Sequence, residues 1–162
     1  MLNIAVIGAG RIGHVHAKTI IAHPDAALAL VCDPVGDAAR TLADQYGTRA
    51  CERAEDVFAD PGIDAVIIGS PTALHIPHLL AAAEAGKAVL CEKPIALDMK
   101  DVEAARAELD AVKSPVMFGF NRRFDPSFAA MRAAVENGRV GELEQLTIIS
   151  RDPAAPPVDY IK

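Results

Sequence analysis

A glycine-rich segment near the N-terminus carries the clearest chemical signal in the sequence. It reads Gly8-Ala9-Gly10-Arg11-Ile12-Gly13 and joins an apolar run to a helix-like run. In such a motif the first glycine permits a tight turn, the second lets the backbone approach a pyrophosphate, and the third lets the helix pack on the strand. The helix N-terminus then offers free N–H groups to the phosphates. The segment predicts a dinucleotide site, in which Arg11 lies either near the phosphates or on the exposed helix surface.

Asp33 is the acidic partner expected of such a site. It follows the next apolar run, about 20 residues after the third glycine, where a carboxylate can accept hydrogen bonds from both hydroxyls of the adenine ribose. The same charge would repel a 2′-phosphate, and the following Pro34-Val35-Gly36 contains no Arg or Lys to bind one. The pattern therefore favours NAD over NADP. The alternative is that Asp33 is only a turn residue before Pro34.

Two further polar groups follow later apolar runs. Ser70-Pro71-Thr72 and His75 can contact the nicotinamide ribose, and ordinary helix capping by Thr72 is the alternative. Glu92-Lys93-Pro94 places two charges at a buried strand end, which indicates that they meet each other or a ligand. Lys93 can lower the pKa of a substrate hydroxyl and help its proton leave as a hydride passes to the nicotinamide. The alternative is a surface lysine before a turn.

Other histidines and the cysteines suggest no chemistry of their own. His14 and His16 are two residues apart on a predicted helix and cannot share a face, so we expect packing or surface roles and no metal site. Cys32, Cys51 and Cys91 form no CxxC pair. We interpret them as reduced structural thiols in a reducing cytoplasm.

The elements that must position these residues alternate along the chain. Apolar runs predict strands at 3–7, 27–32, 48–51, 63–68, 88–91 and 116–120. Amphipathic runs predict helices at 12–22, 37–46, 54–59, 73–85 and 98–112. This order predicts an α/β fold, a doubly wound Rossmann sheet of about six mostly parallel strands, with ligands outside the carboxyl ends of the strands.

The pattern changes after the last of these strands. A helix is predicted at 126–137 and a strand at 143–150, followed by the proline-rich segment 153–157. We interpret these as the first helix and strand of a truncated second α+β domain. The expected boundaries are an NAD-binding domain at 1–120 and the start of an incomplete substrate-binding or oligomerisation domain at 121–162.

Composition excludes several classes of partner. The 162 residues carry a formal net charge of -6 with no basic stripe, which argues against nucleic acid. A hydrophobic fraction of 51% with only 4% aromatic residues suits helices packed on a parallel sheet. No signal peptide or membrane-length apolar stretch is present in the sequence, so we expect no membrane partner and a cytoplasmic location.

The order of the motifs resembles the N-terminal half of the family of glucose-fructose oxidoreductase, inositol dehydrogenase and the rhizopine catabolism proteins. The resemblance rests on residues 8–13 with Asp33, on Asp64-Ala65-Val66 leading to Ser70-Pro71-Thr72 and His75, and on Glu92-Lys93-Pro94. Within that family, residues 119–126 and the tail 150–162 look most like the myo-inositol 2-dehydrogenases.

The resemblance implies a reaction and its residues. Lys93 would be the catalytic lysine, Arg123 with Arg122 would lie near a polyol or sugar substrate, and NAD would take a hydride as a ring hydroxyl becomes a ketone. Family members also use an Asp and a His from the second domain, in a segment that would begin shortly after Lys162. We therefore expect a catalytically incomplete chain that binds NAD without oxidising inositol. A homo-oligomer is implied as well, because members usually associate through the second domain.

Two other functions stay open at this point. One is a stand-alone NAD-binding or regulatory module without catalysis. The other is a structural subunit that pairs with another chain through the edge of the predicted strand 143–150. Titration with NAD separates the structural subunit, which would not bind NAD, from the dehydrogenase part and the stand-alone module, which would.

Overall fold

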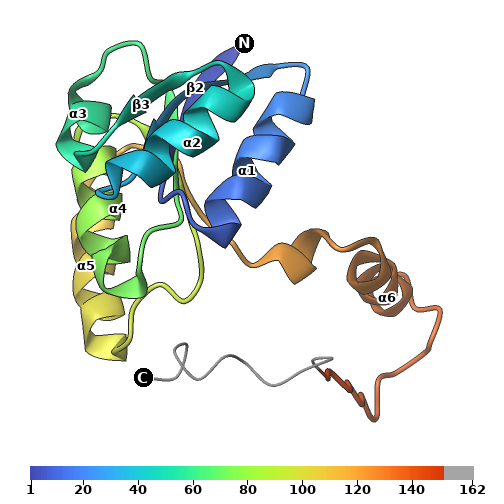
Figure 1. Cartoon of the computed structure of the whole chain (residues 1–162). Helices are drawn as coiled ribbons and strands as arrows, with labels where there is room; N and C mark the ends of the chain where they lie inside the picture. The colour runs from blue at the N-terminus through green and yellow to red at the C-terminus, as the bar shows by residue number, and fades with distance from the viewer. Residues whose placement is uncertain (152–162) are drawn as a thin grey trace. The chain divides into compact units, whose positions relative to one another are not determined.

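The computed structural model describes residues 1–151 and divides into two compact units. The first unit is Met1–Phe120, and the second begins at Asn121. The first contains a six-stranded sheet with helices against both faces (Figure 1). The candidate site residues from Gly8 to Lys93 all belong to the first unit. The two units are described in turn.

The first unit alternates strands and helices as the sequence predicts. The strands are β1 (Leu2–Ile7), β2 (Ala26–Cys32), β3 (Arg49–Cys51), β4 (Ala65–Ile68), β5 (Ala88–Cys91) and β6 (Val116–Phe118). The helices are α1 (Arg11–Ala22), α2 (Gly36–Tyr46), α3 (Ala54–Ala59), the 3-10 turn η1 (Thr72–Leu74), α4 (His75–Glu84) and α5 (Met99–Ala111). Every neighbouring pair is parallel in the order β3-β2-β1-β4-β5-β6, which confirms the predicted Rossmann sheet.

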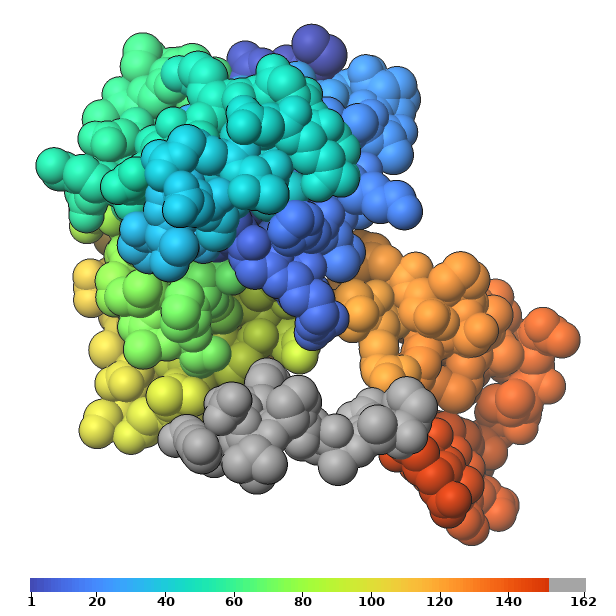
Figure 2. Space-filling model, viewed as in Figure 1, coloured from blue at the N-terminus to red at the C-terminus, as the bar shows by residue number. Residues whose placement is uncertain are grey.

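Alternation along the strands builds a core on each face of the sheet. Ala5 and Ile7 of β1 face a cluster that includes Leu79 of α4, together with side chains of α3 and α5. Val6, between them, faces the opposite cluster with side chains of α1 and α2 such as Leu42. Because strand side chains point alternately to opposite faces, an unbroken apolar strand can fill both cores. Figure 1 shows α2 in front of the strands, and the space-filling view shows its residues on the outer surface (Figure 2).

Local signals set the ends of several helices. Gly47 takes a left-handed conformation, with φ of 64°, and α2 ends before it at Tyr46, the end predicted for this helix. Asp98 caps α5, because its side chain accepts a hydrogen bond from the backbone N–H of Lys100 at 3.0 Å. The helix predicted at 73–85 instead starts as η1 and becomes α-helical only at His75.

The second unit contains a 3-10 turn, η2 (Asn121–Phe124), and the helix α6 (Pro126–Glu136). The Asp125 side chain caps α6 by accepting from the backbone N–H groups of Ser127 and Phe128. The predicted strand at 143–150 was wrong, since those residues form no strand. An alternating sequence becomes a strand only with a hydrogen-bonded neighbour, and the described part of this unit contains none. The segment 153–157 lies outside the described residues.

None of the helices within residues 1–151 is both long and apolar enough to cross a membrane.

We predict that the core around α4 dominates the stability of the first unit. Leu79 is completely buried, so Leu79→Ala should lower the free energy of unfolding by about 2–5 kcal/mol, through lost transfer energy and the cavity left behind. The matched control is Leu97→Ala, at a leucine that is 82% exposed, which should change it by less than about 0.5 kcal/mol. Urea denaturation measures both, and equal effects would contradict this account of the core.

Candidate cofactor site at the carboxyl edge of the sheet

Parallel pairing brings the predicted site residues of the first unit to one edge of the sheet. The residues directly after the strands extend the hydrogen-bond ladder, for example from Gly8 N–H to the Cys32 carbonyl at 2.7 Å and from Glu92 N–H to the Ile68 carbonyl at 2.9 Å. Strand order reverses between β1 and β4, and ligands of such sheets bind at that switch point. The loops after β1 and β4 both open there.

The glycine loop, residues 8–13, needs glycine at three positions for different reasons. Gly8 has φ of +105°, and a Cβ there would lie 2.5 Å from the carbonyl oxygen of Gly69. A Cβ on Gly13 would collide with the carbonyl oxygen of Gly8. By contrast, a Cβ on Gly10 would meet nothing within 4 Å. Gly8 and Gly13 therefore serve internal packing, whereas Gly10 borders open space into which a pyrophosphate fits.

The other residues of the glycine loop shape the same surface. Gly10 is the N-cap of α1 and no side chain caps that helix, so its first N–H groups are directed to the open edge. Ala9 is 7% exposed, and Ile12 packs so close to Gly69 that a Cβ there would lie 2.9 Å from the Ile12 Cγ2. Arg11 is exposed at the start of α1. This arrangement fits an anionic dinucleotide.

Asp33 is fixed against the glycine loop. Its Oδ2 accepts a hydrogen bond from the backbone N–H of Ala9 at 2.8 Å, and its Oδ1 accepts one from the N–H of Val35 at 2.8 Å. The bond from Val35 corresponds to the alternative in which Asp33 is a turn residue. The bond from Ala9 places the same carboxylate at the glycine loop, so Asp33 has both roles. A carboxylate has about four acceptor positions, and two are used here. Its remaining lone pairs can accept from ribose hydroxyls.

The β4–η1 loop, residues 69–71, is held by two histidines of α4. Ser70 Oγ lies 3.1 Å from His78 Nδ1, and the Ser70 carbonyl oxygen lies 2.8 Å from His75 Nε2. His75 itself is 2% exposed, and its Nδ1 lies 2.7 Å from the Pro94 carbonyl oxygen. Both of its ring nitrogens are therefore engaged by the protein backbone.

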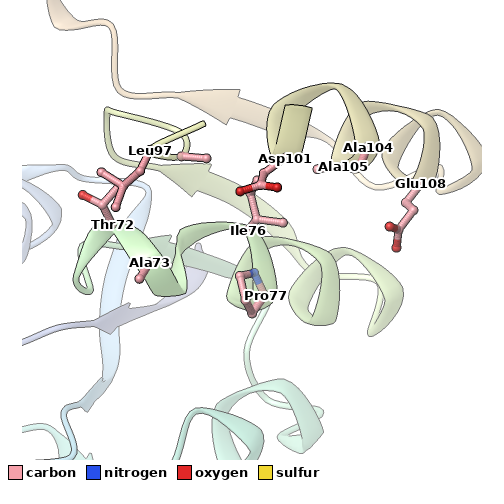
Figure 3. A pocket seen from close by; sticks show the side chains of 10 residues that line it. Thr72, Ala73, Ile76, Pro77, Leu97, Asp101, Ala104, Ala105 and Glu108 are labelled. Atoms are coloured by element: carbon pink, nitrogen blue, oxygen red, sulfur yellow. The ribbon is translucent and has the colours of Figure 1, made fainter. Parts of the chain in front are cut away.

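Thr72 lines a separate cavity beside this loop. The cavity has a volume of about 410 Å³ between α4 and α5, and Thr72 and Leu97 lie at one end of it, with Glu108 at the other (Figure 3). The capping role considered for Thr72 is not present, since no side chain caps either η1 or α4.

Glu92 points to α1 rather than to its neighbour Lys93. Its Oε1 lies 2.8 Å from His16 Nε2, and both side chains are largely buried. Its Oε2 accepts a hydrogen bond from the backbone N–H of Lys93 at 3.2 Å. A Cβ on Gly119, at the end of β6, would lie 3.0 Å from the Glu92 carboxylate. Glu92 thus connects α1 to the Glu-Lys-Pro turn, residues 92–94.

Lys93 is the exposed charge of that turn. Neighbouring residues at a strand end point in opposite directions, so Lys93 stays available to a ligand while Glu92 is engaged. Of the two alternatives, in which Glu92 and Lys93 meet each other or a ligand, the first is not what the structure shows, because the partner of the Glu92 carboxylate is His16.

The cysteines that precede Asp33 and Glu92 are unsuited to nucleophilic chemistry. All three cysteines are free thiols, and Cys32 and Cys91 are buried. Burial raises the pKa of Cys91 to about 12, and it also raises the pKa of Cys32. Both thiols therefore stay protonated at neutral pH, and a protonated thiol is a poor nucleophile.

The predicted substrate arginines belong to the second unit. Arg122 and Arg123 lie in η2, and the Arg122 guanidinium stacks on the Phe128 ring with its carbon 5.1 Å from the ring centroid. Its Nη2 also donates to Ser150 Oγ at 3.4 Å. The proposed contact of these arginines with substrate stays a prediction.

Sequence reasoning missed two contributors to the first unit's site. His16 was interpreted as a packing or surface residue, but it holds Glu92, and Gly119 leaves room for that carboxylate. No local signal identifies either, because the contact joins residues 76 positions apart in the chain. Within residues 1–151, no group of three or more His, Cys, Asp or Glu side chains is placed to hold a metal ion.

Known proteins share both the sequence and the fold. The chain is 48% identical over 163 aligned residues to the inositol 2-dehydrogenase of Rhizobium meliloti, covering 99% of this chain and 48% of that protein. The crystal structure of a myo-inositol dehydrogenase from Corynebacterium glutamicum superposes with a TM-score of 0.93 at 52% identity, over 99% of this chain and 48% of that one. The scyllo-inositol dehydrogenase of Lactobacillus casei, with bound NAD(H) and scyllo-inositol, gives a TM-score of 0.83 at 30% identity, over 88% and 43% of the two chains.

These comparisons identify the family of the chain and show how much of its relatives' length the chain spans. The chain spans about half the length of the curated relatives that it matches. Residues 2–120 match the Gfo/Idh/MocA family, described as an oxidoreductase family with an NAD-binding Rossmann fold. That match covers the whole sheet and its carboxyl-edge loops. The chain therefore belongs to the Gfo/Idh/MocA oxidoreductase family, and its first unit is the family's NAD-binding domain.

Proposed function

We propose that this chain is the cofactor-binding part of an NAD-dependent dehydrogenase that oxidises a ring hydroxyl of an inositol-like polyol to a ketone. The observation that carries the proposal is the meeting of two groups at one edge of the sheet. The glycine loop, held by Asp33, lies at the end of β1, and the Glu-Lys-Pro turn lies at the end of β5. The relatives named above, which act on inositols, support the substrate class. Free thiols suit a location in the reducing cytoplasm.

Each residue of the site has a defined task in this proposal. The N–H groups at the start of α1 bind the pyrophosphate beside Gly10, and Asp33 accepts from the adenine ribose. The β4–η1 loop borders the nicotinamide half of the cofactor. Bound NAD would accept the hydride. Lys93 donates to the substrate oxygen and stabilises the negative charge that develops on it as the hydroxyl proton passes to the Asp and His that the resemblance implies in the second domain. Arg122 and Arg123 bind the polyol.

The glycine loop allows a matched test of cofactor binding. Gly10→Ala places a methyl in open space, so it should leave the thermal midpoint unchanged but weaken NAD binding by about tenfold or more, because the methyl occupies the pyrophosphate position. Gly13→Ala collides with the Gly8 carbonyl and should lower both stability and NAD affinity. Calorimetric titration and thermal unfolding measure the two effects. Wild-type NAD affinity in the Gly10→Ala variant would refute the proposed site.

Asp33 should determine the preference for NAD over NADP. Asp33→Asn removes the charge that repels a 2′-phosphate and weakens the hydrogen bonds to the ribose, so NAD affinity should fall by about tenfold and the NAD-to-NADP affinity ratio should narrow. Asp37→Asn, at an exposed carboxylate paired with Arg40, is the control and should leave the ratio unchanged. Titration with NAD and with NADP measures the affinity ratio. An unaltered ratio in Asp33→Asn argues against the assignment of Asp33 to the adenine ribose.

The 162-residue chain should bind NAD without catalysing turnover. The resemblance implies that the Asp and the His used for proton transfer belong to the second domain, and the relatives named for the reaction are about twice as long. We expect no NADH absorbance when the chain is incubated with NAD and myo-inositol, with the Rhizobium meliloti enzyme as the positive control. Sustained NADH formation that Lys93→Met abolishes would show that the chain is catalytically sufficient.

A further inference from the structure

His75 combines deep burial with an unusual pair of partners. Its side chain joins the β4–η1 loop to the Glu-Lys-Pro turn, with Nε2 at 2.8 Å from the Ser70 carbonyl oxygen and Nδ1 at 2.7 Å from the Pro94 carbonyl oxygen. Both distances are typical of hydrogen bonds. At 2% exposure, water cannot substitute for either partner. The ring therefore connects the ends of β4 and β5.

Two carbonyl partners impose a condition on the ring. A carbonyl oxygen only accepts, so each ring nitrogen must donate a proton to its partner. A neutral imidazole has one N–H and one lone pair, whereas an imidazolium has an N–H at both nitrogens. In the neutral ring, one of the two contacts would set a lone pair against a carbonyl oxygen. Burial disfavours a cation, but hydrogen bonds made only by the charged form favour it.

We propose that His75 is a positioning residue held as a buried imidazolium, which clamps the Ser70 carbonyl to the Pro94 carbonyl. Pro94 directly follows Lys93, so the clamp fixes the backbone of the proposed catalytic lysine relative to the loop that borders the nicotinamide. The effect on cofactor binding rests on the proposed function, whereas the charge of the ring does not.

The groups around the ring are consistent with a single cation at this point. On the same helix, His78 contacts Ser70 Oγ, and burial lowers its pKa. Glu55 of α3 raises the His78 pKa and a positive charge on His75 lowers it, but burial is the largest effect, so His78 stays neutral. On the β5 side, the Glu92 carboxylate is turned to His16. The positive charge of His75 is thus stabilised by the dipoles of two carbonyl groups, and neither ring nitrogen has a carboxylate as its partner.

The charge of the ring is tested directly by NMR of the wild-type chain labelled with ¹⁵N-histidine. The protein has five histidines, and His75→Gln assigns the resonances of interest. Above neutral pH, where a histidine ring in water carries only one N–H, both ring nitrogens of His75 should still carry protons. An unprotonated ring nitrogen at that pH, whether from a neutral tautomer or a flipped ring, overturns the proposal.

The positioning role is tested by cofactor titration of the same variant. His75→Gln removes the cation and one of the two clamped contacts, so NAD affinity should fall by about tenfold. His23→Gln, at an exposed histidine after α1, is the matched control and should bind NAD like the wild type. Wild-type affinity in His75→Gln refutes the positioning role. If the wild-type chain itself fails to bind NAD, the proposed function is wrong, and the ring spectrum still decides the charge of His75.

Discussion

The parallel pairing of β1 with β2 on one side and β4 on the other is the constraint on which the rest of the molecule depends. It places β1 inside the sheet and brings the carboxyl ends of the strands to the same edge. The loops after β1 and β4 then lie in contact, to the point that a side chain on Gly8 would collide with the Gly69 backbone. A site made of residues far apart in sequence follows from that one topological fact.

Bonds between side chains and backbone join the loops of this edge, in addition to the backbone ladder that continues past the strands. Asp33 fixes the Ala9 amide, Glu92 fixes the Lys93 amide, and His75 joins two carbonyl oxygens. Such bonds set the path of a loop without the large apolar contacts that hold a strand or a helix. They also leave the outer surface of each loop open to a ligand. In this molecule the rigid sheet provides the positions, and a few polar side chains provide the geometry.

Most of the fold could be predicted from the sequence because its signals are local. Gly47, Asp98 and the glycine loop act on neighbouring residues, and an apolar run between turn residues needs no partner to be recognised. The strand expected at 143–150 failed for the opposite reason, since strand formation depends on a neighbour that periodicity cannot supply. In the same way, the residue types of the site could be selected from sequence, but their partners could not. Only the crossing of α1 over the sheet brings His16 to Glu92.

The hydrogen bond between Ala9 and Asp33 has a consequence for the thermodynamics of recognition. Both partners of this bond belong to the protein, so the backbone around Gly10 is ordered by intramolecular contacts. A ligand that docks on a preorganised loop loses less conformational entropy than one that must first order a loosely held segment. Folding of the sheet thus contributes to the affinity for the pyrophosphate, because it orders the loop before the ligand binds. A change far from the ligand that loosens the end of β2 would therefore weaken binding without removing a single ligand contact.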